Sequence, residues 1–308
     1  MTREGKRKLV QELHDKGLTI DAALKIAGMK RSTYYYRSTV KGSDEVLLEK
    51  IKEIAFKHPY YGYRRIWAVL RRQGYKVNKK RVYRLYSMAK LVLFTEKRRR
   101  KKGGDKYEVI EAERINHIWS MDFCFIRAGN RRIKVLAIED EYSRVALGIF
   151  CGYSMTGEDV VSAIKKTMEI WGKPEYIKSD NGPEFRSRVL ERFMEKNRIK
   201  SSFIEKGKPY QNGHTERFIG SLKKECLLTE DFENLQEVNE SVRRYREFFN
   251  KERPNQSLDY QTPLEYYQKE VTGKYSSIEG GNNNLSRLFF PSLNLFINPP
   301  FFTYHTGN

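Results

Sequence analysis

Three acidic residues lie where carboxylates from separate segments could act together. Asp122 interrupts the apolar run of a predicted strand, Asp180 lies just past the carboxyl end of another, and Glu216 lies on a predicted helix. A carboxylate in a buried strand is costly unless it is paired, hydrogen-bonded or bound to a metal ion. Open α/β sheets build their sites at the carboxyl ends of strands. We therefore predict that the three carboxylates meet at one edge of a sheet.

Carboxylates clustered without His or Cys ligands suit a hard divalent cation, Mg²⁺ or Mn²⁺. Two such ions about 3.5 to 4 Å apart can activate a water or a 3′-hydroxyl and stabilise the leaving oxygen of a phosphodiester. His214, close to Glu216, is then not required as a general base. The chain has 39 acidic residues, so this spacing alone does not decide the chemistry.

The positive charge of the chain is concentrated in its first third. The formal net charge is +20, from 59 Lys and Arg against 39 Asp and Glu. Residues 1–102 hold 29 basic and 9 acidic residues, whereas residues 103–308 hold 30 of each. A basic excess of this size indicates a polyanionic partner. Double-stranded DNA fits both this excess and the phosphodiester chemistry.

The neutral two-thirds of the chain predicts an α/β sheet with helices packed on it. The expected strands are 118–126, 133–138, 145–150, 176–178 and 200–204. The expected helices are 157–171 after a Thr156–Asp159 capping box, 183–197 opened by Pro183, 212–227 and 235–250. The first three strands follow one another closely, with a turn at Gly129, and predict an antiparallel meander.

Two helical units precede the sheet. The first 40 residues predict three short helices, and the last of them, 30–37, is basic and aromatic like a helix that lies in a DNA groove. A helical hairpin with a solvated basic face is the alternative. In the second unit, Asn78 is the expected N-cap of a helix over 79–89. Its cations, which would neutralise phosphates, are Lys79, Lys80, Arg81 and Arg84.

The predicted domains are a helix-turn-helix-like region at 1–42, a second helix-turn-helix domain at 43–94, a basic linker at 95–106, a catalytic core at 107–272 and a tail at 273–308. The tail has no assigned role; its composition is typical of disorder, although its many Phe residues argue against simple solvation. Three separated cysteines predict neither a disulfide framework nor a zinc site. No signal peptide or membrane span is expected, so we predict a cytoplasmic protein.

The residues around the carboxylates resemble the DDE transposases of bacterial insertion sequences, in particular the IS-three family, over roughly residues 44–267. In the basic unit the matching residues are His58, Tyr61, Gly62, Arg64, Arg65 and Ile66. In the core they are Trp119, Asp122 and Phe123, then 179–185, and then Lys208, Pro209, Gln211, Asn212, Gly213, Glu216, Arg217, Phe218, Leu222, Lys223 and Glu225. The match ends with Phe249, Asn250, Arg253, Pro254, Asn255, Thr262 and Pro263. Asp180 and Glu216 are separated by 35 residues, the interval for which such sites are named.

The resemblance implies an RNase H-like core with a mixed five-stranded sheet, preceded by all-α helix-turn-helix domains. It implies two divalent ions at Asp122, Asp180 and Glu216, cleavage at the ends of the element, and transfer of the freed 3′-hydroxyl to target DNA. The implied partners are the terminal repeats and target DNA, further copies of the chain, and an upstream-frame protein or fusion. A bacterial, nucleoid-associated location in the cytoplasm follows, with no membrane.

We expect several polar residues to contact DNA. Lys223 follows Glu216 by seven residues on the same helix face, where it could hold a phosphate beside the metal ions. The other candidates are Asn181, Gln211 and Asn212 near the carboxylates and Arg64 and Arg65 in the basic unit, besides the four cations of 79–89.

Two other functions remain open. A non-catalytic regulator could retain the core as a scaffold and compete for the element's ends, but three intact carboxylates favour the enzyme. A tyrosine recombinase cleaves DNA through a covalent phosphotyrosine. The 20 tyrosines of the chain give that alternative little support, because no Arg and His constellation surrounds one of them.

Overall fold

A computed structural model describes residues 1–36, 42–92, 110–203 and 213–278. The core is built on one mixed sheet in the order β3-β2-β1-β4-β5. Its strands are β1 (Ile118–Ala128), β2 (Arg131–Asp140), β3 (Ala146–Gly152), β4 (Tyr176–Ser179) and β5 (Lys200–Phe203). The β1–β2 and β2–β3 pairs are antiparallel, whereas β4 pairs in parallel with both β1 and β5. The predicted meander and five-stranded mixed sheet are confirmed.

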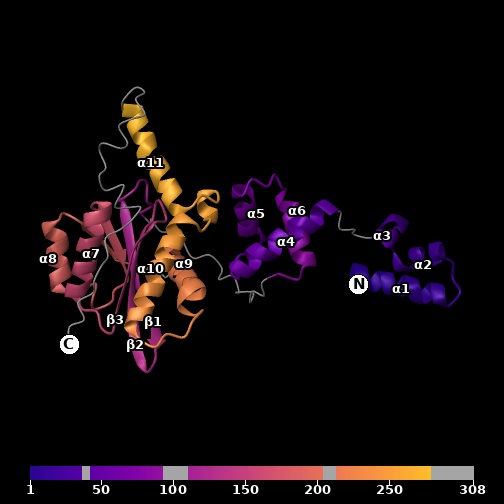
Figure 1. The fold of residues 1–308 in the computed structure, drawn as a ribbon, viewed down its shortest axis with the longest axis horizontal. Coiled ribbons are helices and arrows are strands. Elements are labelled where there is room, and N and C mark those ends of the chain that lie inside the picture. The colour runs from indigo at the N-terminus through magenta and orange to yellow at the C-terminus, as the bar shows by residue number, and fades with distance from the viewer. Residues whose placement is uncertain (37–41, 93–109, 204–212, 279–308) are drawn as a thin grey trace.

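Helices cover both faces of the sheet (Figure 1). Helices α7 (Gly157–Trp171) and α8 (Arg188–Lys196) close the apolar core on one face, around Trp119, Leu136 and Ile164. Helices α9 (Gly213–Leu222) and α10 (Leu235–Lys251) close the core on the other face. Alternate side chains of β1 point to opposite faces, so this strand contributes to both cores.

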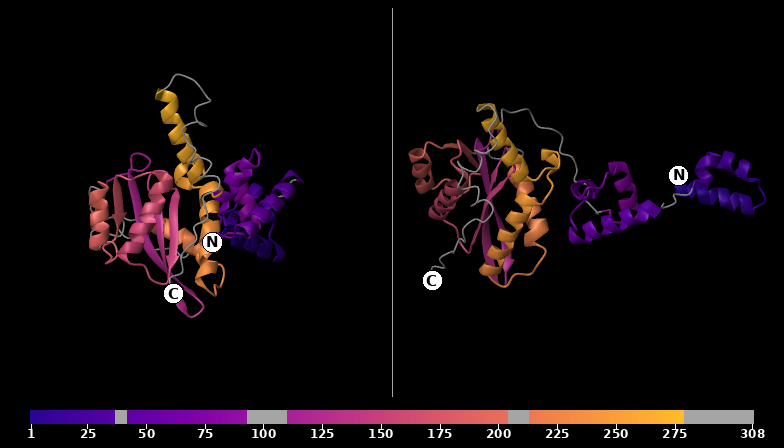
Figure 2. Two further views of the ribbon diagram at one scale, coloured as in Figure 1. Left: turned by 60° about the vertical axis from the view of Figure 1, so that its left-hand side comes forward. Right: turned by 45° about the horizontal axis from the view of Figure 1, so that its top comes forward.

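Local signals account for most helix ends and for two differences from expectation. The capping box of Thr156 and Asp159 forms as predicted. The helix expected from Pro183 begins only at Arg188, because the Ser187 side chain caps it. The single helix expected over 212–227 is α9 followed by a π-helical segment, η2 (Lys223–Leu227). Helix α11 (Pro263–Ile278) was not predicted and projects away from the sheet (Figures 1 and 2).

Two small helical units precede the core, each with its own buried apolar cluster. The first contains α1 (Arg3–Asp15), α2 (Ile20–Ala27) and α3 (Arg31–Tyr35). The second contains α4 (Gly42–Lys57), α5 (Tyr63–Arg72) and α6 (Lys79–Met88), and is called the α4–α6 unit below. The Asn78 side chain caps α6 as predicted, accepting a 2.8 Å bond from the Lys80 amide. Within the described ranges, no helix combines the length and apolarity needed to cross a membrane.

Candidate active site

The register of two parallel strands places Asp122 and Asp180 near each other. Ser120 of β1 pairs with Lys178 of β4, and each aspartate follows its strand residue by two positions. Parallel neighbours run in step, so the two carboxylates lie at the same edge of the sheet. This is the edge that the sequence predicted.

Asp122 is half-buried, and its surroundings place the other predicted groups close to it. The pKa of this carboxyl is raised to about 6, mainly by burial and also by the charges of Asp180 and Glu216. Lys223 and a 2.7 Å bond from the Phe123 amide oppose this rise. The structure therefore brings Asp122, Asp180, Glu216 and Lys223 into one electrostatic neighbourhood.

Asp180 lies in an exposed turn beyond β4. Its Oδ1 accepts a 2.9 Å bond from the Gly182 amide, which fixes one carboxylate oxygen and leaves the other toward solvent. The Asn181 side chain is exposed beside it. Gln211 and Asn212, the other predicted DNA contacts near the carboxylates, lie outside the described residues.

Glu216 and Lys223 approach Asp122 from one helical stretch. Glu216 is exposed in the first turn of α9, and Lys223 begins η2. Buried Phe218 and Leu222 anchor this stretch to the sheet through the apolar core. Packing on the side facing the sheet therefore sets where Glu216 and Lys223 stand.

The donor set fits a hard divalent cation. The carboxylates repel one another at Asp122, and that repulsion is relieved by a cation bound between them. No three His, Cys, Asp or Glu side chains in the described part of the chain stand close enough together to form a ready-made metal site. Binding of an ion by all three carboxylates would therefore require these side chains to move closer together, and Asp180 and Glu216 are exposed, without packing that opposes such a movement.

Asp122→Asn is expected to stabilise the metal-free protein by up to about 3 kcal/mol above pH 7. Folding raises the carboxyl pKa from 3.8 to about 6, so the penalty is absent below pH 3.8 and complete above pH 6. Urea unfolding in EDTA measures it, with the exposed Asp231→Asn as control. Added Mg²⁺ should stabilise the wild type more than Asp122→Asn, and an equal gain would contradict metal binding here.

A second polar row lies behind the carboxylates, under the start of α9. Glu139 of β2 pairs with Ser120 of β1, and Ser120 pairs with Lys178 of β4. Lys178 forms a buried ion pair with Glu141 at 3.1 Å. Sequence analysis missed this row, although Glu139, Asp140 and Glu141 interrupt an apolar run much as Asp122 does.

Burial and the charges of Arg144 and Arg217 lower the pKa of His214 to about 4, so this side chain is neutral at pH 7. The pKa of Glu139 is raised to about 8, mainly because its side chain is fully buried. Glu139 is therefore protonated at pH 7, where a neutral side chain is cheaper to bury than a carboxylate.

Glu139→Gln should remove a pH-dependent loss of stability. Between pH 4.5 and pH 8 the unfolded wild type has released the Glu139 proton while the folded protein retains it, so stability falls as pH rises. Relative to the variant, we expect the wild type to lose up to about 5 kcal/mol across this window. Urea unfolding at pH 5, 6.5 and 8 measures the difference. Parallel curves for the two proteins would contradict the assignment.

The predicted cations of the α4–α6 unit have different surroundings. Lys80 and Arg64 are exposed. Lys79 lies 4.4 Å from the Trp67 ring centre. Arg81 and Arg84 clamp the buried Asp44 carboxylate at 2.6 and 2.5 Å, while their own side chains stay 37% and 43% exposed.

Arg65 differs from the other predicted cations because it faces the core. Its guanidinium is 3.3 Å from the Glu225 carboxylate, and its side chain is only 27% exposed. Arg65 is the least exposed of the predicted arginines of this unit and its partner belongs to the core, so we do not retain it among the proposed DNA contacts.

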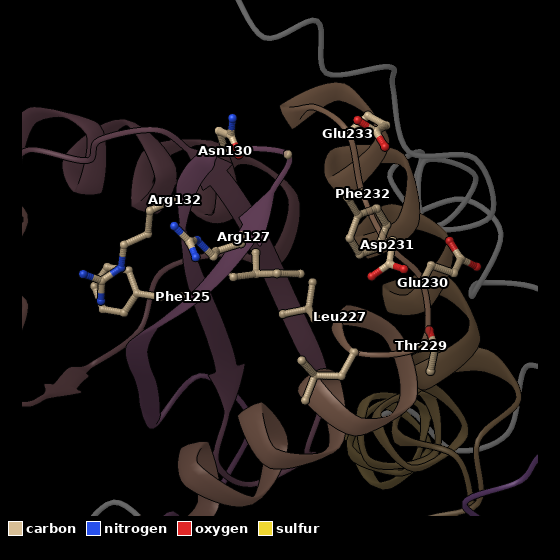
Figure 3. Close-up of a pocket in the computed structure, with 13 residues that line it drawn as sticks. Phe125, Arg127, Asn130, Arg132, Leu227, Thr229, Glu230, Asp231, Phe232 and Glu233 are labelled. Atoms are coloured by element: carbon tan, nitrogen blue, oxygen red, sulfur yellow. The ribbon is translucent and has the colours of Figure 1, made fainter.

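A groove lies farther along the same sheet face, at the β1–β2 hairpin (Figure 3). Its volume is about 1080 Å³. Arg127 and Arg132 project from the hairpin, while Glu230, Asp231 and Glu233 lie across the groove on the segment after η2. The groove therefore has one basic wall and one acidic wall.

Comparison with known proteins decides the family. A 31.7 kDa protein of insertion element IS407 from Burkholderia multivorans is 33% identical over 254 residues, covering 80% of this chain and 90% of the relative. This chain belongs to the DDE transposases of bacterial insertion sequences. Family models match residues 42–102 as an HTH-like domain and residues 112–209 and 197–263 as integrase core domain.

A further relative and a solved structure are also similar to this chain. A putative transposase of element IS150 from Escherichia coli is 27% identical over 80% of this chain and 93% of its own length. Among solved structures, the HTLV-2 integrase catalytic core domain in complex with magnesium is 22% identical, with a TM-score of 0.41, covering 50% of this chain and 97% of that one. The HTH-like domain preceding a mixed sheet flanked by helices is the RNase H-like arrangement that the sequence predicted.

Proposed function

We propose that this transposase binds the ends of its insertion sequence, cleaves the DNA strand there and joins the freed 3′-hydroxyl to target DNA. One observation carries the proposal: Asp122, Asp180, Glu216 and Lys223 share one electrostatic neighbourhood at the edge of an integrase-core sheet. Family membership supports the same reaction class.

The protein's own groups have distinct proposed roles. Asp122, Asp180 and Glu216 would hold two ions of Mg²⁺ or Mn²⁺, which supply activation of the attacking oxygen and stabilisation of the leaving oxygen when bound. Lys223 would hold a phosphate beside the carboxylates and offset their repulsion of the DNA backbone. His214, neutral at pH 7, adds no positive charge beside Glu216 and is not proposed as a base.

DNA docking is assigned to the basic α4–α6 unit. The proposed contacts are its exposed cations Arg64, Lys80 and Arg84, its half-buried cations Lys79 and Arg81, and the polar residues Asn181, Gln211 and Asn212. Two DNA ends must be held together for joining, so we propose that the active form is an oligomer on DNA.

The test uses duplexes ending in the element's terminal repeats, incubated with full-length protein in Mg²⁺, Mn²⁺ or EDTA. We expect a nicked end bearing a 3′-hydroxyl and a joined product, both dependent on the metal ion. Binding of the ends without cutting or joining in either metal would contradict the proposal and favour the non-catalytic regulator.

A further inference from the structure

Two groups of residues far apart in the sequence meet in space between the α4–α6 unit and the core. His58, Tyr61 and Arg65 come from the α4–α6 unit, and Phe248, Phe249 and Arg253 come from the end of α10 and the residues just after it. The His58 ring stacks on Phe248 at 5.4 Å, and Arg65 reaches Glu225 at 3.3 Å. The two units therefore share a contact of defined geometry, called the junction below.

Glu225 is the centre of the junction. Its carboxylate is 9% exposed and accepts two bonds from Arg253, from Nε at 2.6 Å and Nη2 at 2.7 Å. Tyr245 donates a third bond at 3.4 Å, and Arg65 adds the contact from the α4–α6 unit. Charge-assisted bonds to a buried carboxylate are strong and directional, so they fix where Glu225 stands.

Glu225 also belongs to the π-helical segment that begins at Lys223. Residues two apart on a helix do not face the same way, so these two side chains serve different sides of the segment. The positive charge of Lys223 counteracts the rise in pKa of the Asp122 carboxyl and of the Cys124 thiol, so Lys223 lies on the side of the carboxylates. Glu225 faces the arginines of the junction. π-helical turns are rare and occur frequently at functional sites.

We propose that Arg65 is a positioning residue for strand cleavage and transfer. By adding a bond to Glu225, which Arg253 already holds, Arg65 restrains η2 further, and η2 holds Lys223 at the carboxylates. Docking of the DNA-binding unit thereby organises the catalytic groups. The activity arm of this inference rests on the proposed function; its structural arm does not.

Substitution of Arg65 removes one contact of the junction and leaves the core intact. Removal of Arg65 leaves Glu225 with both bonds from Arg253, so no buried charge loses its last partner. Removal of Glu225 would instead leave Arg253, whose side chain is only 4% exposed, without its carboxylate partner, and would favour unfolding. Arg65→Gln is therefore the informative variant, and Arg65→Lys keeps the charge.

A second ion pair between the two units supplies a matched control. Arg72 contacts Glu265 at 2.5 Å and the Tyr260 carbonyl at 3.0 Å, far from η2 in the chain. Arg72→Gln removes an arginine of the same helix and a contact across the same boundary. It leaves Glu225 untouched.

The first experiment measures amide hydrogen exchange over residues 223–228 in the full-length chain, without DNA or metal. We expect exchange to rise about tenfold in Arg65→Gln, to return most of the way in Arg65→Lys, and to stay at the wild-type rate in Arg72→Gln. An unchanged rate in Arg65→Gln, or an equal rise in Arg72→Gln, would overturn the inference.

The second experiment measures single-turnover cleavage of end DNA at saturating protein. We expect Arg65→Gln to cleave about tenfold more slowly with an unchanged Kd for DNA, and Arg72→Gln to match the wild type. A loss of DNA affinity that accounts for the slower cleavage, or wild-type cleavage by Arg65→Gln, would overturn the inference. A wild type that does not cleave defeats the proposed function, and hydrogen exchange then still decides whether Arg65 restrains η2.

Discussion

Asp180→Asn is expected to lower the rate of end cleavage by about 10³-fold or more while the protein still binds the ends. The amide is a weaker metal ligand than the carboxylate and cannot carry the charge that a divalent cation requires. Asp180 is exposed, and its Oδ1 accepts a hydrogen bond from the Gly182 amide. The side-chain oxygen of an asparagine can accept the same bond. The fold should therefore survive, and single-turnover cleavage in Mg²⁺ measures the loss.

Asp231→Asn is the matched control for this prediction. Asp231 is exposed on the segment after η2 and lines the separate groove at the hairpin. This control should cleave at the wild-type rate. Cleavage by Asp180→Asn within a few-fold of the wild type would show that this carboxylate does not take part in the reaction.

The second large effect is the salt dependence of DNA binding. Residues 1–102 carry 29 basic and 9 acidic residues, so we expect about six phosphate contacts to come from this region. Each neutralised phosphate releases counterions, and the affinity of the full-length chain should fall about 10³-fold between 50 and 200 mM salt. Fluorescence anisotropy with a labelled duplex measures the slope.

A single exposed cation should contribute a measurable part of that slope. Lys80→Ala is expected to reduce the slope of log K against log salt by about one unit. Lys196→Ala, at the exposed end of α8 in the neutral core, should leave it unchanged. A shallow slope for the wild type, or equal effects of both variants, would contradict DNA docking by the α4–α6 unit.

The sequence was sufficient to predict the parts of the fold that depend on local patterns. Alternating and continuous apolar runs mark β1 to β5, and the polar caps Thr156 and Asn78 mark two helix starts. The strand that carries Asp122 was recognisable because a carboxylate in an apolar run demands a special environment. The same reasoning extends to Asp180 at the end of β4.

Features that depend on distant contacts were not predictable from the sequence. The helical pattern of 212–227 does not reveal that η2 departs from α-helical geometry. In the structure, Glu225 of η2 is bound by Arg65 and Arg253, which lie in two distant segments of the chain. Arg65 has the composition of a DNA contact, and only the packed junction turns it toward the core. Pro183 and Ser187 are both suitable residues for the beginning of a helix. In the structure the Ser187 side chain caps α8, so the helix begins at Arg188.

The most direct test of the central claim is joining of a pre-cut element end, which already bears its 3′-hydroxyl, to target DNA in Mg²⁺. Wild type, Asp122→Asn, Asp180→Asn and Glu216→Gln are compared at protein concentrations that saturate the DNA. We predict that all four bind the end, that the wild type alone joins it, and that EDTA abolishes joining. Joining by any of the variants at the wild-type rate, or a wild type that binds the end and does not join it in Mg²⁺ or Mn²⁺, would contradict the account.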